Sequence, residues 1–160
     1  MYLTDILDPK WIKLPLEATT KEGLIAELIE LLVAEGALER PDEALQAVLD
    51  REGVRTTGIG HGLALPHGKC DTAGRLVMAI GMTRTPVDFE SVDGRPVDLV
   101  VLLVGPTART ALHVQTLARI ARFLNTEAFR NQLRAARSGE ELYRLIQRRE
   151  GTEGAMAPDV

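Results

Sequence analysis

The sequence predicts a single α/β domain in which helices cover both faces of a β-sheet. Two runs dense in aliphatic residues, 76–82 and 97–105, are bounded by glycine and proline, as buried strands are. Apolar residues recur with helical spacing before and after these runs. The chain has 160 residues, of which 45% are hydrophobic, and this length favours one domain with one core.

The first third of the chain predicts one strand and two helices. Residues 11–16 alternate apolar and polar side chains, which indicates a short strand. Thr19 and Glu22 have the spacing of a capping box ahead of an apolar helical stripe. Pro41 is suited to the first turn of a second helix, which ends near Gly53.

The C-terminal part predicts three helices followed by a tail. Helical spacing favours a long helix over 112–124 and shorter helices near 126–136 and 138–148. Residues 149–160 are rich in small and polar residues, so we expect a disordered tail there. The folded domain is therefore expected to cover residues 1–148.

Composition bounds the class of function. The net charge of −4 argues against a nucleic-acid-binding protein, although residues 119–149 carry eight arginines against three glutamates. That basic region indicates either solvated helix faces or a docking surface for an acidic protein. No apolar run approaches the ~20 residues that cross a bilayer, and the N-terminus does not resemble a signal peptide. A single cysteine fits a reducing compartment, so we expect a cytoplasmic protein without membrane insertion.

The segment GIGHGLALPHGKC, from Gly58 to Cys70, concentrates the residues that could carry chemistry. A dinucleotide loop is disfavoured, because the third glycine of its G-x-G-x-x-G fingerprint is replaced by Leu63 and a helix precedes the segment. A zinc site is an open alternative, with ligands from His61, His67, Cys70 and His113. The spacing of these residues is not a recurring ligand pattern, which disfavours zinc.

A reactive histidine is the third interpretation. The apolar residues 63–65 predict a short strand that Pro66 ends, so His67 would project from a rigid element with open space beside Gly68. An imidazole beside backbone N–H groups and hydroxyl groups is suited to carry a phosphoryl group, whose oxygens those donors can bind. We expect these donors to come from the loop before the strand, at Thr56, Thr57, Gly58, Gly60 and Gly62.

Two residues elsewhere extend this candidate site. His113 lies in the first turn of the long helix, where the partial positive charge of the helix N-terminus favours a neutral imidazole and attracts anions. Arg51 lies at the end of the second helix and offers a planar fork for phosphate oxygens. Arg55 is a competing candidate for that role.

The run from Glu52 through Ile59-Gly60 to LALPHG, which includes His67, resembles the active-site signature of the type-2 IIA domains. These domains belong to the mannitol/fructose class of the bacterial phosphoenolpyruvate-dependent phosphotransferase system (PTS). The segments DFESVDGRPVDLVVLLVGP and LHVQTLARIARFL resemble the same family in the same order. The resemblance covers roughly residues 4–148.

The resemblance implies a three-layer α/β/α sandwich around a mixed β-sheet and a phosphoryl carrier that needs no cofactor. The donor would be the phosphocarrier HPr or its nitrogen-branch paralogue. The acceptor would be Nε2 of His67, with His113 as the supporting histidine and Arg51 as the active-site arginine. The ending SGEELYRLI resembles the nitrogen-regulatory branch, in which the phosphorylation state controls a target protein. The alternative is a stand-alone fructose- or mannitol-type component that passes the group to a IIB cysteine for sugar uptake.

Overall fold

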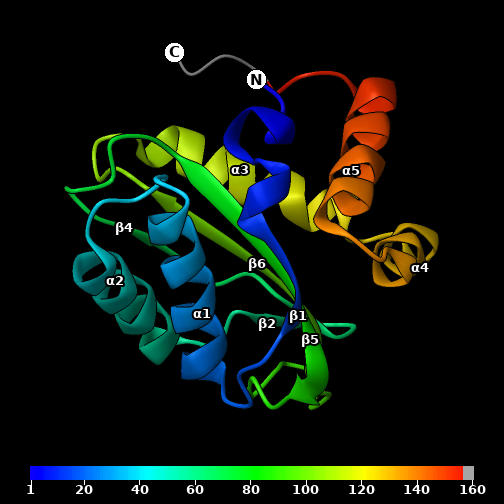
Figure 1. Ribbon diagram of the computed structural model, residues 1–160, viewed down its shortest axis with the longest axis horizontal. Coiled ribbons are helices and arrows are strands. Elements are labelled where there is room, and N and C mark those ends of the chain that lie inside the picture. Colours follow the sequence, from blue (N-terminus) through cyan, green and yellow to red (C-terminus); the bar gives the residue numbers. More distant parts are fainter. Residues whose placement is uncertain (157–160) are drawn as a thin grey trace.

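A mixed sheet forms the centre of the molecule in the computed structural model, which describes residues 1–156 (Figure 1). Its strands are neighbours in the order β1-β5-β6-β3-β2, and β4 also pairs with β6. Strands β5 and β6 are antiparallel, as are β2 and β3, whereas β1 is parallel to β5 and both β3 and β4 are parallel to β6. The bounds are β1 Ile12–Leu16, β2 Gly58–Gly60, β3 Leu63–Ala64, β4 His67–Lys69, β5 Val77–Val87 and β6 Val97–Gly105.

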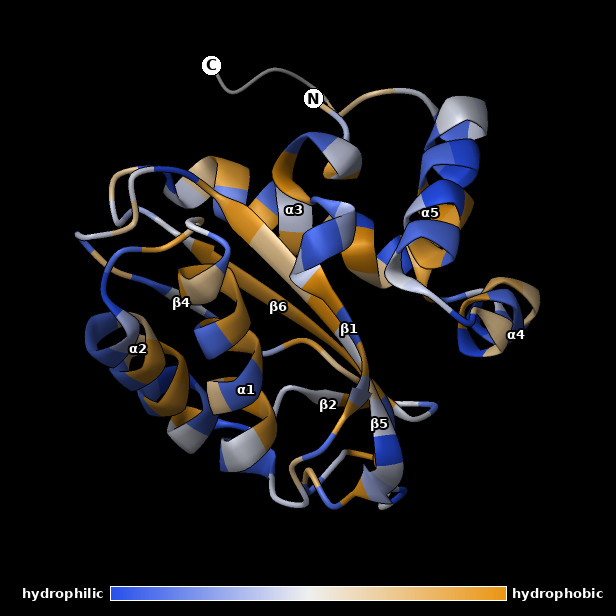
Figure 2. Ribbon diagram, viewed as in Figure 1, coloured by the Kyte–Doolittle hydropathy of each residue, from blue (hydrophilic) through white to orange (hydrophobic). Residues whose placement is uncertain are grey.

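The two aliphatic runs form the central strands, as predicted. Strand β6 occupies the predicted residues and is hydrophobic along most of its length in Figure 2, and Val97 and Val100 have no exposed surface. Strand β5 begins at Val77, one residue after the predicted start, and continues to Val87. Because helices cover both faces of these strands, a continuous aliphatic pattern suits them better than an alternating one.

Helices lie on both sides of the sheet, which confirms the predicted layers (Figure 1). Helices α1 (Lys21–Ala34) and α2 (Pro41–Val54) lie on one side. On the other side, α3 (Thr110–Phe123), α4 (Glu127–Ala135) and α5 (Gly139–Glu153) pack on the sheet. Between this layer and the sheet, apolar residues of β5 and β6 lie against apolar residues of the helices. The strand residues are Met78, Ile80, Leu99 and Val101, and the helix residues are Ile120, Phe123, Phe129 and Ile146.

The start of α1 differs from the prediction by one residue. The N-cap is Thr20 and not Thr19, because the Thr20 hydroxyl accepts a hydrogen bond from the Gly23 N–H at 3.0 Å. Pro41 occupies the first turn of α2, as predicted. No helix within residues 1–156 combines the length and the apolar character that a membrane crossing requires.

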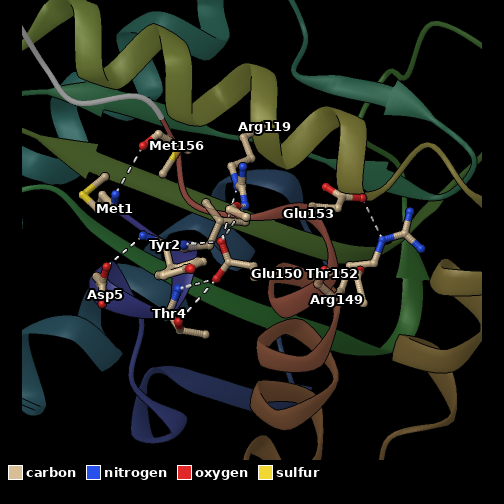
Figure 3. Close-up of polar contacts among 12 residues, drawn as sticks. Met1, Tyr2, Thr4, Asp5, Arg119, Arg149, Glu150, Thr152, Glu153 and Met156 are labelled. Carbon is tan, nitrogen blue, oxygen red and sulfur yellow. Dashed lines mark hydrogen bonds and ion pairs between the residues drawn. The ribbon is translucent and has the colours of Figure 1, made fainter.

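The predicted boundary at residue 148 is wrong, because α5 continues to Glu153 and Glu150 is only 1% exposed. The Glu150 carboxylate accepts hydrogen bonds from the N–H groups of Leu3 and Thr4, at 2.6 and 3.0 Å, and pairs with buried Arg119 (Figure 3). These contacts join the end of α5 to the N-terminus and to α3, so the segment after residue 148 belongs to the folded domain. The rest of the predicted tail, residues 157–160, lies outside the described residues.

Candidate active site

His67 is the first residue of β4 and follows Pro66 directly. It pairs with Leu103 of β6, whose N–H donates to the Pro66 carbonyl oxygen at 3.1 Å. The backbone of His67 is therefore held by the central sheet, while its half-buried ring lines a surface pocket. A side chain on a sheet strand is positioned more rigidly than one on a free loop.

The hydrogen bond of the His67 ring selects one tautomer. Nδ1 lies 2.8 Å from the carbonyl oxygen of Leu65. Because a carbonyl oxygen can only accept, Nδ1 carries the proton in the neutral ring, and Nε2 keeps its lone pair. The geometry thus leaves Nε2 as the nucleophilic nitrogen.

His113 lies beside His67, with the ring centroids 5.6 Å apart and the planes tilted by 55°. It comes from the first turn of α3, as predicted, and is 4% exposed. Both ring nitrogens are buried without a hydrogen-bond partner among residues 1–156. Gly105 lies next to the ring and makes room for Leu76, because a Cβ there would lie 2.7 Å from Leu76 Cδ1, whereas its distance of 3.5 Å from His113 Nδ1 would be an ordinary contact. A buried polar group without a partner is costly, so His113 is better explained by function than by stability.

Both rings are held in the neutral form. Burial lowers the pKa of His67 below its ordinary value, and the positive charges of Arg51 and Lys69 act in the same direction. The hydrogen bond to Leu65 opposes this shift. Burial also lowers the pKa of His113, to about 4, and the neighbouring His67 and Lys69 contribute. At neutral pH both imidazoles are therefore uncharged, as a nucleophile and a neutral hydrogen-bond donor need to be.

The His113 ring is expected to make stability depend on pH. Its folded-state pKa of about 4 lies below the ordinary 6.5, so the unfolded chain takes up this proton at a higher pH than the folded chain. The free energy of unfolding is therefore unaffected by this group above about pH 6.5, and it falls as the pH falls towards 4. Between pH 7 and pH 4, the free energy of unfolding of His113→Phe, measured with urea, should fall by about 3 kcal/mol less than that of the unsubstituted chain. Equal losses would contradict the burial of a neutral ring.

Arg51 and His67 line the same pocket, whose volume is about 410 Å³. Arg51 is in the last turn of α2, and its Nη1 donates to the Arg55 carbonyl oxygen at 2.9 Å. Helix α2 reaches the site because it packs closely on β4, where a Cβ at Gly68 would lie 2.9 Å from the Val48 nitrogen. The expectation of open space beside Gly68 is therefore wrong. Gly68 instead allows the helix that carries Arg51 to approach the strand that carries His67.

The predicted hydroxyl donors lie at this pocket but are bonded within the chain. Thr57 is 4% exposed, and both its N–H and its hydroxyl bond to the buried carboxylate of Glu52. The Thr56 hydroxyl donates to the Phe89 carbonyl oxygen at 2.6 Å and accepts from the Gly58 N–H at 3.1 Å. The hydrogen bonds of Thr56, Thr57 and Gly58 are therefore already used within the chain, whereas Arg51 lines the pocket and His113 adjoins the His67 ring.

The two other glycines of the predicted phosphate site lie away from the pocket at His67. Gly60 approaches the Asp93 carboxylate, and Gly62 approaches Asp98 and Arg134. Neither lines the pocket at His67, and Gly62 lines a separate pocket. These two glycines belong to the turn between β2 and β3 and not to the pocket at His67.

The zinc alternative is not supported. Within residues 1–156 no three histidine, cysteine, aspartate or glutamate side chains gather in a way that could hold a metal ion. His61 lines the separate pocket at the β2–β3 turn. Cys70 is buried, and its sulfur lies 3.6 Å from the Thr72 hydroxyl.

Sequence reasoning missed two charged residues and an apolar rim. Lys69 follows His67 on β4 and contacts the Thr110 hydroxyl at 3.1 Å, close to both rings. Glu52 bonds Thr57 and pairs with Lys21 at 3.2 Å. The position of Glu52, directly after Arg51 at the start of the family signature, is the sequence feature that could have identified it. The apolar rim of the pocket includes Ile59, Val92, Leu117, Ala118 and Ala121.

Known proteins are similar to this chain in sequence and architecture. A nitrogen regulatory protein of Bradyrhizobium diazoefficiens is 36% identical over 146 residues, which cover 91% of this chain and 95% of that protein. The crystal structure of nitrogen regulatory protein IIA-Ntr from Neisseria meningitidis superposes with a TM-score of 0.83 at 30% identity, over 90% of this chain and 98% of that one. Enzyme IIA-mannitol of Escherichia coli, in its complex with phosphorylated enzyme IIB-mannitol, gives 0.73 at 26% identity, over 86% and 94%.

The family model described as "Phosphoenolpyruvate-dependent sugar phosphotransferase system, EIIA 2" matches residues 5–149. The match spans the whole sheet, the layers on both sides and the pocket at His67. The resemblance seen in the sequence is thereby confirmed, and the chain belongs to the type-2 EIIA family of the phosphotransferase system.

Proposed function

We propose that this protein is a phosphoryl carrier that accepts a phosphoryl group from phospho-HPr, or from its nitrogen-branch paralogue, on Nε2 of His67. The observation that carries the proposal is the bond from His67 Nδ1 to the Leu65 carbonyl, in a ring that lines the pocket shared with Arg51. This bond leaves one nucleophilic nitrogen on a ring anchored to the sheet. We place the carrier in the cytoplasm, where PTS donors are found.

The transfer proceeds by in-line attack. The lone pair of His67 Nε2 forms the new bond to phosphorus, and the bond from phosphorus to HPr breaks with its electron pair leaving on the donor. Nδ1 keeps its proton and continues to donate it to the Leu65 carbonyl oxygen, whose dipole stabilises the positive charge that develops on the ring. Little covalent chemistry remains for the protein, so positioning and charge stabilisation dominate the rate.

Two side chains are suited to the oxygens of the transferring group. Arg51 supplies a fixed positive charge and a planar fork of N–H groups at the pocket. His113 supplies a neutral ring whose nitrogens have no competing partner among the described residues. A donor aimed in advance at developing charge does not need to reorganise during the reaction.

Incubation of the chain with phospho-HPr should give one acid-labile phosphoryl group per chain, detected by intact-mass spectrometry. A chain that takes up no group from phospho-HPr or from its nitrogen-branch paralogue would contradict the proposal.

Arg51→Gln should slow this uptake about 100-fold, as the loss of a single preorganised donor does in other enzymes. The matched variant Arg55→Gln keeps the carbonyl that Arg51 contacts and should retain most of the rate. A larger loss in Arg55→Gln than in Arg51→Gln would assign the phosphate contact to Arg55.

We further propose a nitrogen-regulatory role, because relatives named nitrogen regulatory proteins align along nearly their full length. Such a role requires a target that binds the two phosphorylation states with different affinity. The second candidate is a sugar-transport component, favoured by the likeness to enzyme IIA-mannitol. Rapid transfer from the phosphorylated chain to a IIB cysteine would favour transport. Capture of a target by only one phosphorylation state would favour regulation.

A further inference from the structure

A second pocket lies at the turn between β2 and β3, the start of β6 and helix α4. Its volume is about 460 Å³, which is within the range of small-molecule sites. None of its lining residues lines the pocket at His67. Three arginines line it, namely Arg95, Arg130 and Arg134. This concentration of positive charge is separate from the phosphoryl-transfer site.

Arg130 is the most informative of the three, because it is only 6% exposed. Its Nη1 donates to the Leu124 carbonyl oxygen at 2.8 Å, at the end of α3. No carboxylate within residues 1–156 forms an ion pair with it. A guanidinium group has five N–H donors, and this contact uses one. A buried charge is costly unless an opposite charge accompanies it, so a bound anion would supply what the protein lacks here.

The other charges at the pocket leave room for such an anion. Both Asp98 oxygens accept from Arg134, at distances of 3.0 to 3.1 Å, so this pair is neutral. Arg95 is exposed at the pocket, near Asp93, whose carboxylate already accepts from two backbone N–H groups. Glu127, the remaining acid of the lining, is exposed. The buried charge of Arg130 is therefore not balanced from within the pocket.

We propose that this pocket binds a small phosphate ester. The phosphate group would contact Arg130 and Arg95, whose forks suit its oxygens, and the Asn131 amide would supply a further donor. A phosphate offers three acceptor oxygens to these groups, whereas a carboxylate offers two. The volume exceeds that of a bare phosphate, and Pro86 and Pro96 provide apolar walls for an organic part.

Titration of the full chain with glycerol 3-phosphate, followed by backbone amide NMR, tests the proposal. Saturable shifts are expected at His61, Gly62 and Asn131, which belong to this pocket. Shifts confined to Thr57 and His67 would show that the ester binds only at the transfer site and would overturn the proposal. The absence of saturable shifts at millimolar concentration would overturn it as well.

Two variants and a matched control assign the contacts. Arg95→Gln should weaken glycerol 3-phosphate binding about tenfold. Arg130→Lys keeps the buried charge but removes the fork, and should weaken binding to a similar degree. Arg40→Gln alters an arginine outside the pocket and should change nothing. Unchanged binding in Arg95→Gln and Arg130→Lys, or equal weakening in Arg40→Gln, would contradict the assignment.

Two further ligands define the chemical class. Inorganic phosphate that binds as tightly as the ester would identify the phosphate group as sufficient and free phosphate as the ligand source. Succinate that binds as tightly as either would overturn the assignment to phosphate. Because Arg51→Gln alters only the transfer site, it should leave ester binding at this pocket intact. Phosphoryl uptake from phospho-HPr is scored separately, so either proposal can fail alone.

Discussion

A chain carrying His67→Ala is expected to take up no phosphoryl group from phospho-HPr. The substitution removes the nucleophile, and neither remaining histidine can replace it. His113 is 4% exposed, with its ring centroid 5.6 Å from that of His67, and His61 lines a different pocket. The measurement is intact-mass spectrometry after incubation with phospho-HPr, and the expected fall in rate is on the order of 10⁶-fold, the loss found when an enzyme's nucleophile is removed.

The control for this variant is His61→Ala, which should be phosphorylated at the full rate. Because His67 is half-buried, circular dichroism and urea unfolding should first confirm that His67→Ala is folded. Normal uptake by a folded His67→Ala chain would move the acceptor to another residue and overturn the site proposed above.

Glu150→Ala is expected to destabilise the chain by about 3–5 kcal/mol. Glu150 joins the N-terminus, α3 and α5, and its partner Arg119 has a side chain only 5% exposed (Figure 3). Removing the carboxylate leaves a buried guanidinium without its counter-charge and leaves the N–H groups of Leu3 and Thr4 unpaired. Urea unfolding followed by circular dichroism measures this loss of free energy.

Glu153→Ala is the matched control on the same helix. Glu153 pairs with Arg149 one turn away, and both side chains are partly exposed. Exposed pairs of this spacing contribute only about 0.3–0.5 kcal/mol. If Glu150→Ala cost no more than Glu153→Ala, the buried network would contribute nothing to stability.

The sequence predicts the central strands well because burial on both faces leaves a local signal. Strands β5 and β6 needed nothing beyond their aliphatic composition and the glycine and proline near them. The end of α5 could not be predicted in this way. The residues after position 148 look polar and poorly ordered in isolation, and they are held by Leu3 and Thr4 from the other end of the chain. Local composition carries no information about such distant partners.

The same distinction between local and distant contacts explains which residues of the candidate site could be predicted. His67, His113 and Arg51 could be found because each lies at the end of a recognisable element, and the structure brings them together. The roles of Thr56 and Thr57 could not be read locally, because Glu52 and the Phe89 carbonyl compete for their hydroxyls. Two neighbouring hydroxyls beside a glycine loop look the same in a sequence whether they face a ligand or the protein.

The central claim is that Nε2 of His67 carries the phosphoryl group. The most direct measurement is NMR of the chain labelled with ¹⁵N in its histidines, before and after phosphorylation by phospho-HPr. The account predicts that one histidine of the three changes its coupling pattern and that this residue is His67. Phosphorus should couple to Nε2, while Nδ1 keeps its proton and donates it to the Leu65 carbonyl oxygen. Phosphorus on Nδ1 of His67, or on His61 or His113, would contradict it.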